Sequence, residues 1–229
     1  MKILALDTAT EVCSVALLLY DSVLARELPP GGGHSAHILP LVQALLAEGG
    51  QALKDLDCIA FGRGPGGFTG VRLAASVTQG LAFGAGLPVV PVSDLLAVAQ
   101  RALDLMPGAA SVLVCNDARM QEVYWSCASR DEAGLAVPVA PEQVGPPDTV
   151  QLPLGLPQPV FGAGRGFAVA PQLAPRLEVS LTPVLVGLLP RAREIARLAV
   201  PQWLAGQAVA AERAQPVYLR NDVAKPSRK

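Results

Sequence analysis

The first 28 residues contain three apolar runs separated by polar turns. The first run, Ile3–Leu6, ends at Asp7, and the second ends at Leu19. A turn at Asp21 leads into a third run, Val23–Leu28, which stops at a cluster of prolines and glycines. Apolar runs of this length bounded by turn residues predict strands, so we expect the chain to open with three antiparallel strands.

Helical periodicity begins after residue 34. Apolar residues recur every three or four positions over Ser35–Glu48, and this spacing predicts a helix. A buried strand is expected at Asp57–Gly62, a second helix from about Gly70 to Phe83, and another strand at Val89–Val92. Strand, helix and strand in this order predict a βαβ unit with parallel strands. A third helix is expected to begin after Ser93, which is a good N-cap residue.

The second half of the chain repeats the opening in outline. Residues 111–126 again contain an apolar run, an aspartate at the turn (Asp117) and a second apolar run, about 110 residues after their counterparts, which predicts an internal duplication. A strand is expected at Val160–Gly164 and an amphipathic helix at Leu189–Leu198. However, 14 of the 21 prolines lie beyond residue 137, which favours fewer regular elements there. We therefore predict an α/β protein of two lobes, residues 1–106 and a reduced second lobe at 107–229, whose C-terminal segment packs back on the first.

Composition excludes several classes of protein. Apolar residues make up 51% and charged residues 16% of the chain, so a disordered protein is excluded. The formal net charge of −1 gives no general attraction to phosphate, which argues against a stand-alone nucleic-acid binder. No apolar run approaches the roughly 18 residues of a membrane span or suits a signal peptide, so we expect a cytoplasmic protein with no membrane partner. The four cysteines lie in apolar stretches without a C-x-x-C motif, so we expect buried free thiols.

A glycine-rich loop before the second predicted helix resembles two phosphate-binding motifs. Residues 62–69 fit the Walker A spacing, but Phe68 occupies the place of the lysine that contacts phosphate. They also fit the dinucleotide motif G-x-G-x-x-G, but the next acidic residue, Asp94, lies too far along the chain. The favoured interpretation is a tight structural or partner-facing turn whose helix-start amides can face an anion. Its motif residues are Gly64, Pro65, Gly66, Phe68, Thr69 and Arg72.

Two aspartates occupy equivalent turns, one in each lobe. Asp7, with the adjacent Thr8, and Asp117 could face a common cleft and hold a hydrated Mg²⁺ with the phosphates of a nucleotide. The alternative is that each carboxylate accepts hydrogen bonds from its own turn amides. Both interpretations stay open for Asp7, whereas for Asp117 the nearby Arg119 favours the structural one.

The chain contains only two histidines, His34 and His37, at the start of the first predicted helix. A catalytic zinc site usually has three protein ligands, and neither a nearby cysteine nor an H-E-x-x-H motif is present. We therefore expect capping and packing roles for both histidines and no metal site. No serine or cysteine lies in a nucleophile-elbow motif, so acyl-enzyme chemistry is not expected.

The second predicted helix is apolar or small on nearly all sides. Such a helix is expected to be buried on more than one face, either by the core or by a second subunit. The favoured hypothesis is a subunit interface made by the first two helices, where glycine and alanine permit close approach. The residues predicted for this interface are Leu41, Leu45, Gly70, Val71, Ala74, Ala75, Gly80 and Leu81.

Four segments together resemble one known family. They are residues 3–17 (ILALDTATEVCSVAL), 62–72 (GRGPGGFTGVR), 117–124 (DARMQEVY) and 216–221 (PVYLRN). From these motifs the chain is identified as a member of the TsaB (YeaZ) family. The resemblance implies the actin-like ATPase fold of sugar kinases and heat-shock chaperones, with two duplicated ribonuclease-H-like lobes. Two positions depart from the family pattern: family members often have serine where Gly67 stands, and His37 replaces a longer polar residue.

The same resemblance implies a role in making threonylcarbamoyladenosine next to the anticodon of tRNAs that read codons starting with A. The chain would be a non-catalytic partner that binds and activates TsaD, the subunit that carries the metal and transfers the threonylcarbamoyl group. TsaE would be the associated ATPase, and TsaC would make the activated intermediate. We also expect a homodimer when TsaD is absent, contact with tRNA only through the complex, no required cofactor, and at most weak binding of an adenine nucleotide with Mg²⁺. The alternatives within the superfamily are a small-molecule kinase and a metallopeptidase.

Overall fold

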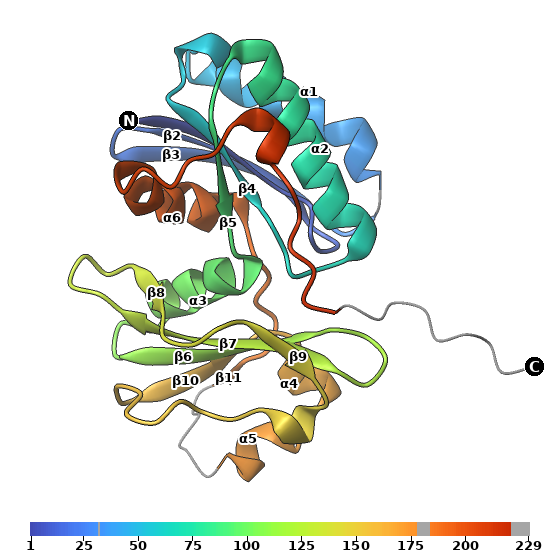
Figure 1. Cartoon of the computed structure of the whole chain (residues 1–229), viewed down its shortest axis with the longest axis vertical. Coiled ribbons are helices and arrows are strands. Elements are labelled where there is room, and N and C mark those ends of the chain that lie inside the picture. Colours follow the sequence, from blue (N-terminus) through green and yellow to red (C-terminus); the bar gives the residue numbers. More distant parts are fainter. Residues whose placement is uncertain (32, 178–183, 221–229) are drawn as a thin grey trace, which may run out of the picture.

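The computed structural model describes residues 1–31, 33–177 and 184–220, which form two α/β lobes stacked one on the other (Figure 1). Each lobe is built on one mixed sheet, and two helices lie between the sheets. The predicted α/β class with two lobes is therefore confirmed.

The first sheet has the strand order β3-β2-β1-β4-β5. Its first three strands pair antiparallel, and the other two continue the sheet in parallel, as predicted. The strands are β1 (Lys2–Asp7), β2 (Cys13–Leu19), β3 (Ser22–Leu28), β4 (Cys58–Gly62) and β5 (Val89–Val92). The connecting helices are α1 (His34–Glu48), the single 3₁₀ turn η1 (Leu53–Asp55) and α2 (Phe68–Ala85).

The second sheet repeats this topology. Its strands are β6 (Ser111–Asp117), β7 (Val123–Arg130), β8 (Ala136–Pro138), β10 (Val160–Ala163) and β11 (Val184–Leu185), and the short β9 (Gln143–Gly145) pairs with β7 outside the main order. The order β8-β7-β6-β10-β11 matches β3-β2-β1-β4-β5, with the same antiparallel and parallel pairings. The predicted duplication is thus confirmed, and two such sheets in tandem are the expected actin-like ATPase fold.

The second lobe has shorter helices than the first. In place of α1 and α2 it carries only η2 (Pro147–Thr149), α4 (Gly166–Val169) and α5 (Leu173–Arg176) among the described residues. Prolines are frequent in these connections, and proline cannot donate the hydrogen bond that a helix interior needs. The lobe is therefore reduced, as the proline distribution predicts.

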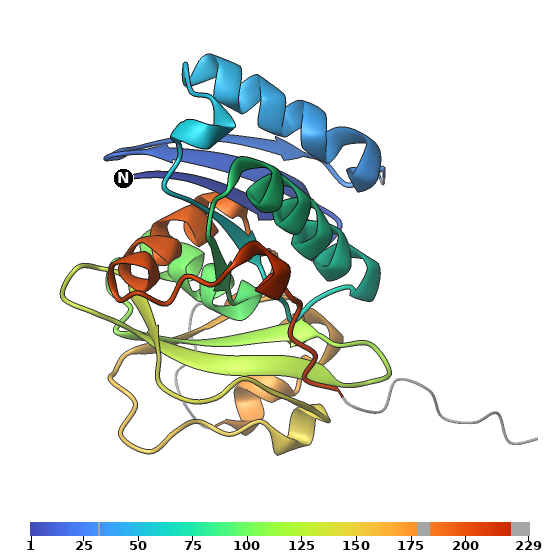
Figure 2. The same ribbon diagram turned by 45° about the horizontal axis from the view of Figure 1, so that its top comes forward.

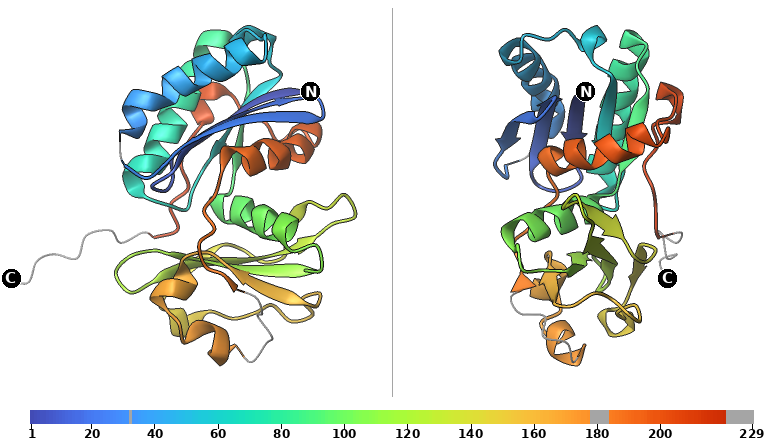
Figure 3. Two further views of the ribbon diagram at one scale, coloured as in Figure 1. Left: turned by 180° about the vertical axis from the view of Figure 1, so that it is seen from behind. Right: turned by 90° about the vertical axis from the view of Figure 1, so that its left-hand side faces the viewer.

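Two helices each pack on the sheet of the lobe to which their neighbours in the sequence do not belong. α3 (Asp94–Leu105) follows the first sheet but packs on β6 and β7 of the second, while α6 (Ala192–Leu204) follows the second sheet but packs on β1 and β2 of the first (Figure 1, Figure 3). The lobe boundary drawn at residue 106 therefore separates α3 from the sheet that it covers. After α6, the 3₁₀ turn η3 (Ala211–Arg213) packs on α2, so the C-terminal segment returns to the first lobe.

Strand β1 is buried on both faces, because each face is covered by different helices. Ile3 belongs to the same core cluster as Ile195 of α6, whereas Leu4 belongs to the cluster that contains Ile38 of α1. Successive strand residues point to opposite faces, so an uninterrupted apolar run is what such a strand requires. Figure 2 shows α1 and α2 on the face of the first sheet that is turned away from the second lobe.

The four cysteines are buried and free, as predicted. Among the helices of the described chain, none combines the length and the apolar character that a membrane span requires.

Candidate functional site: the cleft between the lobes

A cavity of about 710 Å³ lies in the cleft between the lobes. Its first-lobe wall consists of the β1–β2 turn, the first residues of α1, and the glycine-rich loop with the start of α2. Its second-lobe wall consists of the β6–β7 turn and Arg165, and the C-terminal segment Val217–Arg220 runs along its edge. The cleft thus brings together the turns that carry most of the sequence motifs.

The glycine-rich loop packs directly on the β1–β2 turn. Thr8 Oγ1 donates a hydrogen bond to the carbonyl of Gly70 at 2.7 Å, and the N–H of Gly67 donates to the carbonyl of Ala9 at 2.7 Å. A Cβ atom on Gly66 would lie 2.7 Å from the Ala9 oxygen, and one on Gly70 would lie 1.9 Å from the Thr8 oxygen. Glycine is therefore needed to bring two backbones into contact, and Gly70 serves this packing rather than the helix–helix interface predicted for it.

Asp7 is buried away from the cavity. Its carboxyl group is fully buried, and its Oδ1 accepts a hydrogen bond from the N–H of Ala9 at 2.8 Å. Burial is the main cause that raises the pKa of Asp7 to about 6, and the neighbouring carboxyl group is that of Asp94. This corrects the placement of Asp7 on the phosphate side of the cleft, and the geometry supports the structural alternative. Thr8 does line the cavity, but its hydroxyl group already donates a hydrogen bond to the carbonyl of Gly70.

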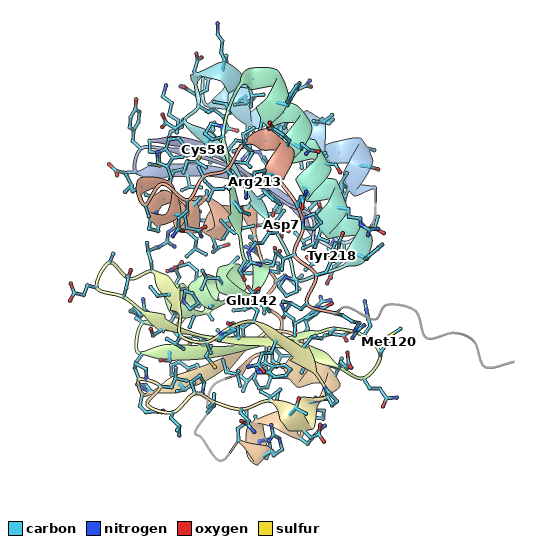
Figure 4. The ribbon with its side chains drawn as sticks, in the orientation of Figure 1. Asp7, Cys58, Met120, Glu142, Arg213 and Tyr218 are labelled. Carbon is cyan, nitrogen blue, oxygen red and sulfur yellow. The ribbon has the colours of Figure 1, made fainter. Side chains whose placement is uncertain are left out.

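Asp117 occupies the equivalent turn of the second lobe and lines the cavity. Its Oδ1 accepts from the N–H of Arg119 at 2.7 Å, and its Oδ2 lies 3.0 Å from the Arg119 guanidinium, in agreement with the structural interpretation. Arg119, Met120 and Gln121 have φ values of 62°, 54° and 62°, a left-handed conformation that is uncommon for residues other than glycine. Met120 stands at the tip of this turn with 70% of its surface exposed (Figure 4).

Two arginines connect the walls of the cleft. Arg220 belongs to the family segment 216–221, but the sequence analysis identified neither contact. Arg165 of the second lobe forms an ion pair with Glu11 in the β1–β2 turn. Arg220 of the C-terminal segment forms an ion pair with Glu122 and donates to the carbonyl of Ala118 at 3.2 Å. Each pair joins residues about 100 or more positions apart, so no local pattern could have revealed it.

The C-terminal segment covers the glycine-rich loop. The N–H of Val217 donates to the carbonyl of Arg63 at 2.7 Å. Gly64 has a φ of 100°, and a Cβ atom on it would lie 3.0 Å from the Val217 oxygen, so this position needs glycine for both reasons. Pro65 is buried beside it, whereas Thr69 is exposed at the cavity wall.

Three side chains join the segment to the start of α2. Arg72 donates from Nε to the hydroxyl of Tyr218 at 2.7 Å, and its guanidinium lies 3.3 Å above the centre of the Phe68 ring. The rings of Phe68 and Tyr218 are 5.8 Å apart. The motif residues Phe68 and Arg72 therefore hold the C-terminal segment in place, at the edge of the cleft where Figure 4 labels Tyr218.

The two histidines have different surroundings. His34 lines the cavity, and its Nε2 lies 3.0 Å from the carbonyl oxygen of Thr10, a contact in keeping with the predicted packing role. His37 is exposed on α1. Within residues 1–31, 33–177 and 184–220, no three metal-binding side chains of His, Cys, Asp or Glu lie close enough together to hold one ion.

Half of the predicted interface residues face the protein's own core. Leu45, Val71, Ala74 and Ala75 are buried under α1 and α2. Leu45 and Ala75 belong to the core cluster that also contains the first-sheet residue Leu4. The interface prediction is corrected at these four positions, because the regular apolar face of each helix is the one that covers the sheet.

The outward face of α1 and α2 carries different residues. Leu41 and Leu81 are half-buried and pack against the same core, and Gly80 is exposed with no atom within 4 Å of its Cβ position. The large apolar side chains on this face are Leu39 and Phe83, which are 44% and 74% exposed. Sequence reasoning missed both, although each stands out of phase with the buried positions of its helix.

Comparisons with known proteins identify relatives along the whole chain. The family model described as TsaD, tRNA N6-adenosine threonylcarbamoyltransferase, matches residues 31–144. The tRNA threonylcarbamoyladenosine biosynthesis protein TsaB of Escherichia coli strain K12 is 44% identical over 229 residues, covering 98% of this chain and 96% of that protein. The protein of the same name from Haemophilus influenzae is 39% identical over 230 residues, covering 97% and 95%.

A solved structure agrees with these sequence relatives. YeaZ from Pseudomonas aeruginosa superposes with a TM-score of 0.87 at 44% identity, covering 95% of this chain and 99% of that one. Relatives of this identity and coverage, together with the duplicated sheets, settle the family. The chain belongs to the TsaB (YeaZ) family of tRNA threonylcarbamoyladenosine biosynthesis proteins.

Proposed function

We propose that this chain is the non-catalytic partner of TsaD in the assembly that transfers the threonylcarbamoyl group to the adenosine next to the anticodon of tRNAs that read codons starting with A. The observation that carries the proposal is the match to TsaB of Escherichia coli along almost the full length of both proteins. The match to the TsaD family model supports it further, because residues 31–144 include α1 and α2. Two related folds can pair through equivalent surfaces, as a homodimer does.

The cleft supports an accessory role rather than a catalytic one. A kinase of this fold needs a carboxylate that is free to act on a bound hydroxyl group. Here Asp7 is buried, Asp117 is paired with Arg119, and Glu11 is paired with Arg165. In the proposal, TsaD performs the transfer, and this chain contributes by binding and activating it.

The proposed contact surface for TsaD is the outward face of α1 and α2. Leu39 and Phe83 supply apolar area there, and covering such area with a partner is favourable at roughly 25 cal/mol per Å². Ser76 and Gly80 are also exposed on α2, and the open space at Gly80 leaves room for a close helix. The same face would form a homodimer in the absence of TsaD, so the two assemblies would compete.

The proposed assembly also includes TsaE, tRNA and a weakly bound nucleotide. TsaE would join as the ATPase of the assembly, in the cytoplasm, and tRNA would contact this chain only through the complex. An adenine nucleotide with Mg²⁺ would bind weakly in the cleft. This is supported by two helices, α1 and α2, that begin at the cavity without an acidic residue in the first turn, since helix N-termini favour anions.

The test is a matched pair of variants in a reconstituted reaction. Phe83→Asp places a charge on the proposed surface, and Leu204→Asp places one at the end of α6, where the leucine is equally exposed at 74%. Phe83→Asp should lose capture of TsaD and threonylcarbamoyladenosine formation with TsaC, TsaD and TsaE, while Leu204→Asp keeps both. Normal capture by both variants would place the interface elsewhere. Transfer by this chain without TsaD would overturn the non-catalytic assignment.

A further inference from the structure

Two buried carboxyl groups meet beneath the glycine-rich loop. Asp7 stands at the end of β1, and Asp94 is the first residue of α3, which packs on the second sheet. Both side chains are fully buried. They meet beside Gly62, where a Cβ atom would lie 2.4 Å from Asp94 Oδ1 and 2.9 Å from Asp7 Oδ1. Glycine at position 62 therefore makes room for the carboxyl pair.

The hydrogen bonds of the pair leave one oxygen on each carboxyl group without a donor. Asp7 Oδ1 accepts from the N–H of Ala9, and Asp94 Oδ2 accepts from the N–H of Gly64. Asp7 Oδ2 and Asp94 Oδ1 are buried and have no donor in the described structure. Asp94 Oδ1 and Asp7 Oδ1 lie against the same point beside Gly62, so the two carboxyl groups are neighbours, and a hydrogen bond between them contributes to the pKa of each. One proton between them would satisfy both groups, because a protonated carboxyl is a donor and a carboxylate is an acceptor.

Among the described residues, no cationic side chain forms a salt bridge with either aspartate. His34 of α1 and the Cys13 thiol of β2 interact electrostatically with Asp7, and Arg63 of the loop interacts electrostatically with Asp94. Arg63 forms its ion pair with Glu142. Two adjacent buried negative charges without a partner are strongly unfavourable.

We propose that Asp94 is a neutral acid near neutral pH, that it donates its proton to the Asp7 carboxylate, and that this proton fixes the glycine-rich loop at the floor of the cleft. Burial, the repulsion by Asp7 and the shared hydrogen bond raise the pKa of Asp94 well above its usual value, while the Gly64 N–H and the Arg63 charge act in the opposite direction. Asp7 and Asp94 are positioning residues in this proposal, since neither lines the cavity.

The loop is attached to Asp94 at two points. The N–H of Gly64 donates to the Asp94 carboxyl group, and the N–H of Asp94 donates to the Gly64 carbonyl at 3.0 Å. Release of the proton to solvent would place a second negative charge next to Asp7 and push the two carboxylates apart. The loop would then lose its attachment to α3, and with it the start of α2 and the C-terminal segment held by Arg63 and Arg72 would loosen.

The experiment combines a direct titration with a pair of variants of the full chain. In the wild type, the carboxyl-carbon NMR signals of aspartates should show one neutral carboxyl group at pH 7. Asp94→Asn substitutes an amide of the same shape, whose N–H can donate to Asp7 at every pH. Asp21→Asn removes an exposed turn carboxylate and serves as the control.

The free energy of unfolding of the wild type should change with pH, because the folded state retains a proton that the unfolded chain releases. Between the ordinary pKa of aspartate and the raised one, the folded wild type binds more protons than the unfolded chain, so its free energy of unfolding falls as the pH rises. In Asp94→Asn, the fall of the free energy of unfolding with pH should be smaller by the amount that corresponds to about one released proton. At alkaline pH the Gly64 amide of this variant should stay protected from hydrogen exchange, whereas that of the wild type should not. Asp21→Asn should behave as the wild type.

Three results would overturn the proposal. One is a wild-type spectrum in which all aspartates are ionised at pH 7, which can be read even if Asp94→Asn fails to fold. Another is the same pH dependence of unfolding in Asp94→Asn and the wild type. The third is a stoichiometric metal ion in the purified protein whose removal shifts the signals of Asp7 and Asp94, because the pair would then share a cation instead of a proton.

Discussion

The carbonyl oxygen of Thr8 lies 1.9 Å from the point where a Cβ atom on Gly70 would sit. The obstructing atom belongs to the backbone, so no side-chain rotation can relieve the collision. Gly70→Ala should therefore destabilise the protein by about 1–3 kcal/mol or more, through displacement of the β1–β2 turn from α2. Urea unfolding followed by far-UV circular dichroism measures this change.

Gly80 provides the matched control for this variant. It lies in the same helix, but its Cβ position has no atom within 4 Å. Gly80→Ala should stabilise the protein by roughly 0.5–1 kcal/mol, because alanine favours a helix interior over glycine. Equal free energies of unfolding for the two variants would show that the turn moves freely away from the helix.

The C-terminal segment offers a second comparison, between two ion-paired arginines. Arg220 is 17% exposed and contacts both Glu122 and the Ala118 carbonyl, whereas Arg119 is 86% exposed and contacts only Asp117. Arg220→Ala should cost about 1–3 kcal/mol, as the loss of charge-assisted hydrogen bonds in a partly buried site does. Arg119→Ala should cost about 1 kcal/mol or less, as expected for a surface pair.

Limited proteolysis distinguishes a local from a global effect of Arg220→Ala. The segment after Ala214 should be cleaved faster in this variant, because one of its attachments to the cleft is lost. The attachments by Val217 and Tyr218 remain. A cleavage pattern identical to that of the wild type would mean that these two contacts suffice to hold the segment.

The sheets and their duplication could be predicted from the sequence because their signals are local. The opening run Ile3–Leu6 is apolar at every position, as a strand covered on both faces must be, and each lobe places an aspartate at the first turn. The proline-rich connections after residue 137 likewise indicated that the second lobe would have few helices. Each strand needs only a short window of residues to be recognised, and the duplication follows from comparing two such windows.

The exchange of α3 and α6 between the sheets could not be predicted in this way. An amphipathic pattern identifies the buried face of a helix, but not which of two apolar sheets covers that face. The same limit applies to the Arg165–Glu11 pair, whose members come from different lobes. For Asp7, the sequence showed a turn carboxylate, but not that Asp94 of α3 would lie beside it in the core.

The buried face of α2 could not be identified from the sequence, because most of the residues of this helix are small. Alanine, glycine and serine suit either a core or a surface, so this helix appeared apolar on every side. Its buried face is in fact regular, with Val71, Ala75, Thr78 and Ala82 under the helix. Phe83 does not fit this face, and it belongs to the surface proposed above for TsaD.

The thiols provide a prediction about pH and reactivity. Burial raises the pKa of Cys13 to about 11 and those of Cys58, Cys115 and Cys127 to about 12. Since the thiolate is the reactive form, the native protein should not react with Ellman's reagent at pH 8 on the time scale on which the unfolded chain releases four equivalents. Rapid modification of one thiol in the native protein would show that a cysteine becomes accessible through local opening.

The first residue of α6 is held by a residue of β2, one of the first-sheet strands on which this helix packs. The N–H of Ala192 donates to Ser14 Oγ at 2.9 Å, and both residues are buried. The residue before the helix, Arg191, makes no side-chain capping bond of its own. Ser14→Ala therefore leaves a buried N–H without an acceptor, which should destabilise the protein by about 1–3 kcal/mol.

Ser76→Ala is the control for this change, because Ser76 is exposed on α2; its effect should stay within about 0.5 kcal/mol. Hydrogen exchange adds a readout at the site itself. Since Ser14 satisfies the first amide of α6, its loss should speed exchange over the first turn of that helix more than over α3. If Ser14→Ala matches the wild type in both measurements, the docking of α6 on the first sheet depends on apolar contacts such as those of Ile195 rather than on this hydrogen bond.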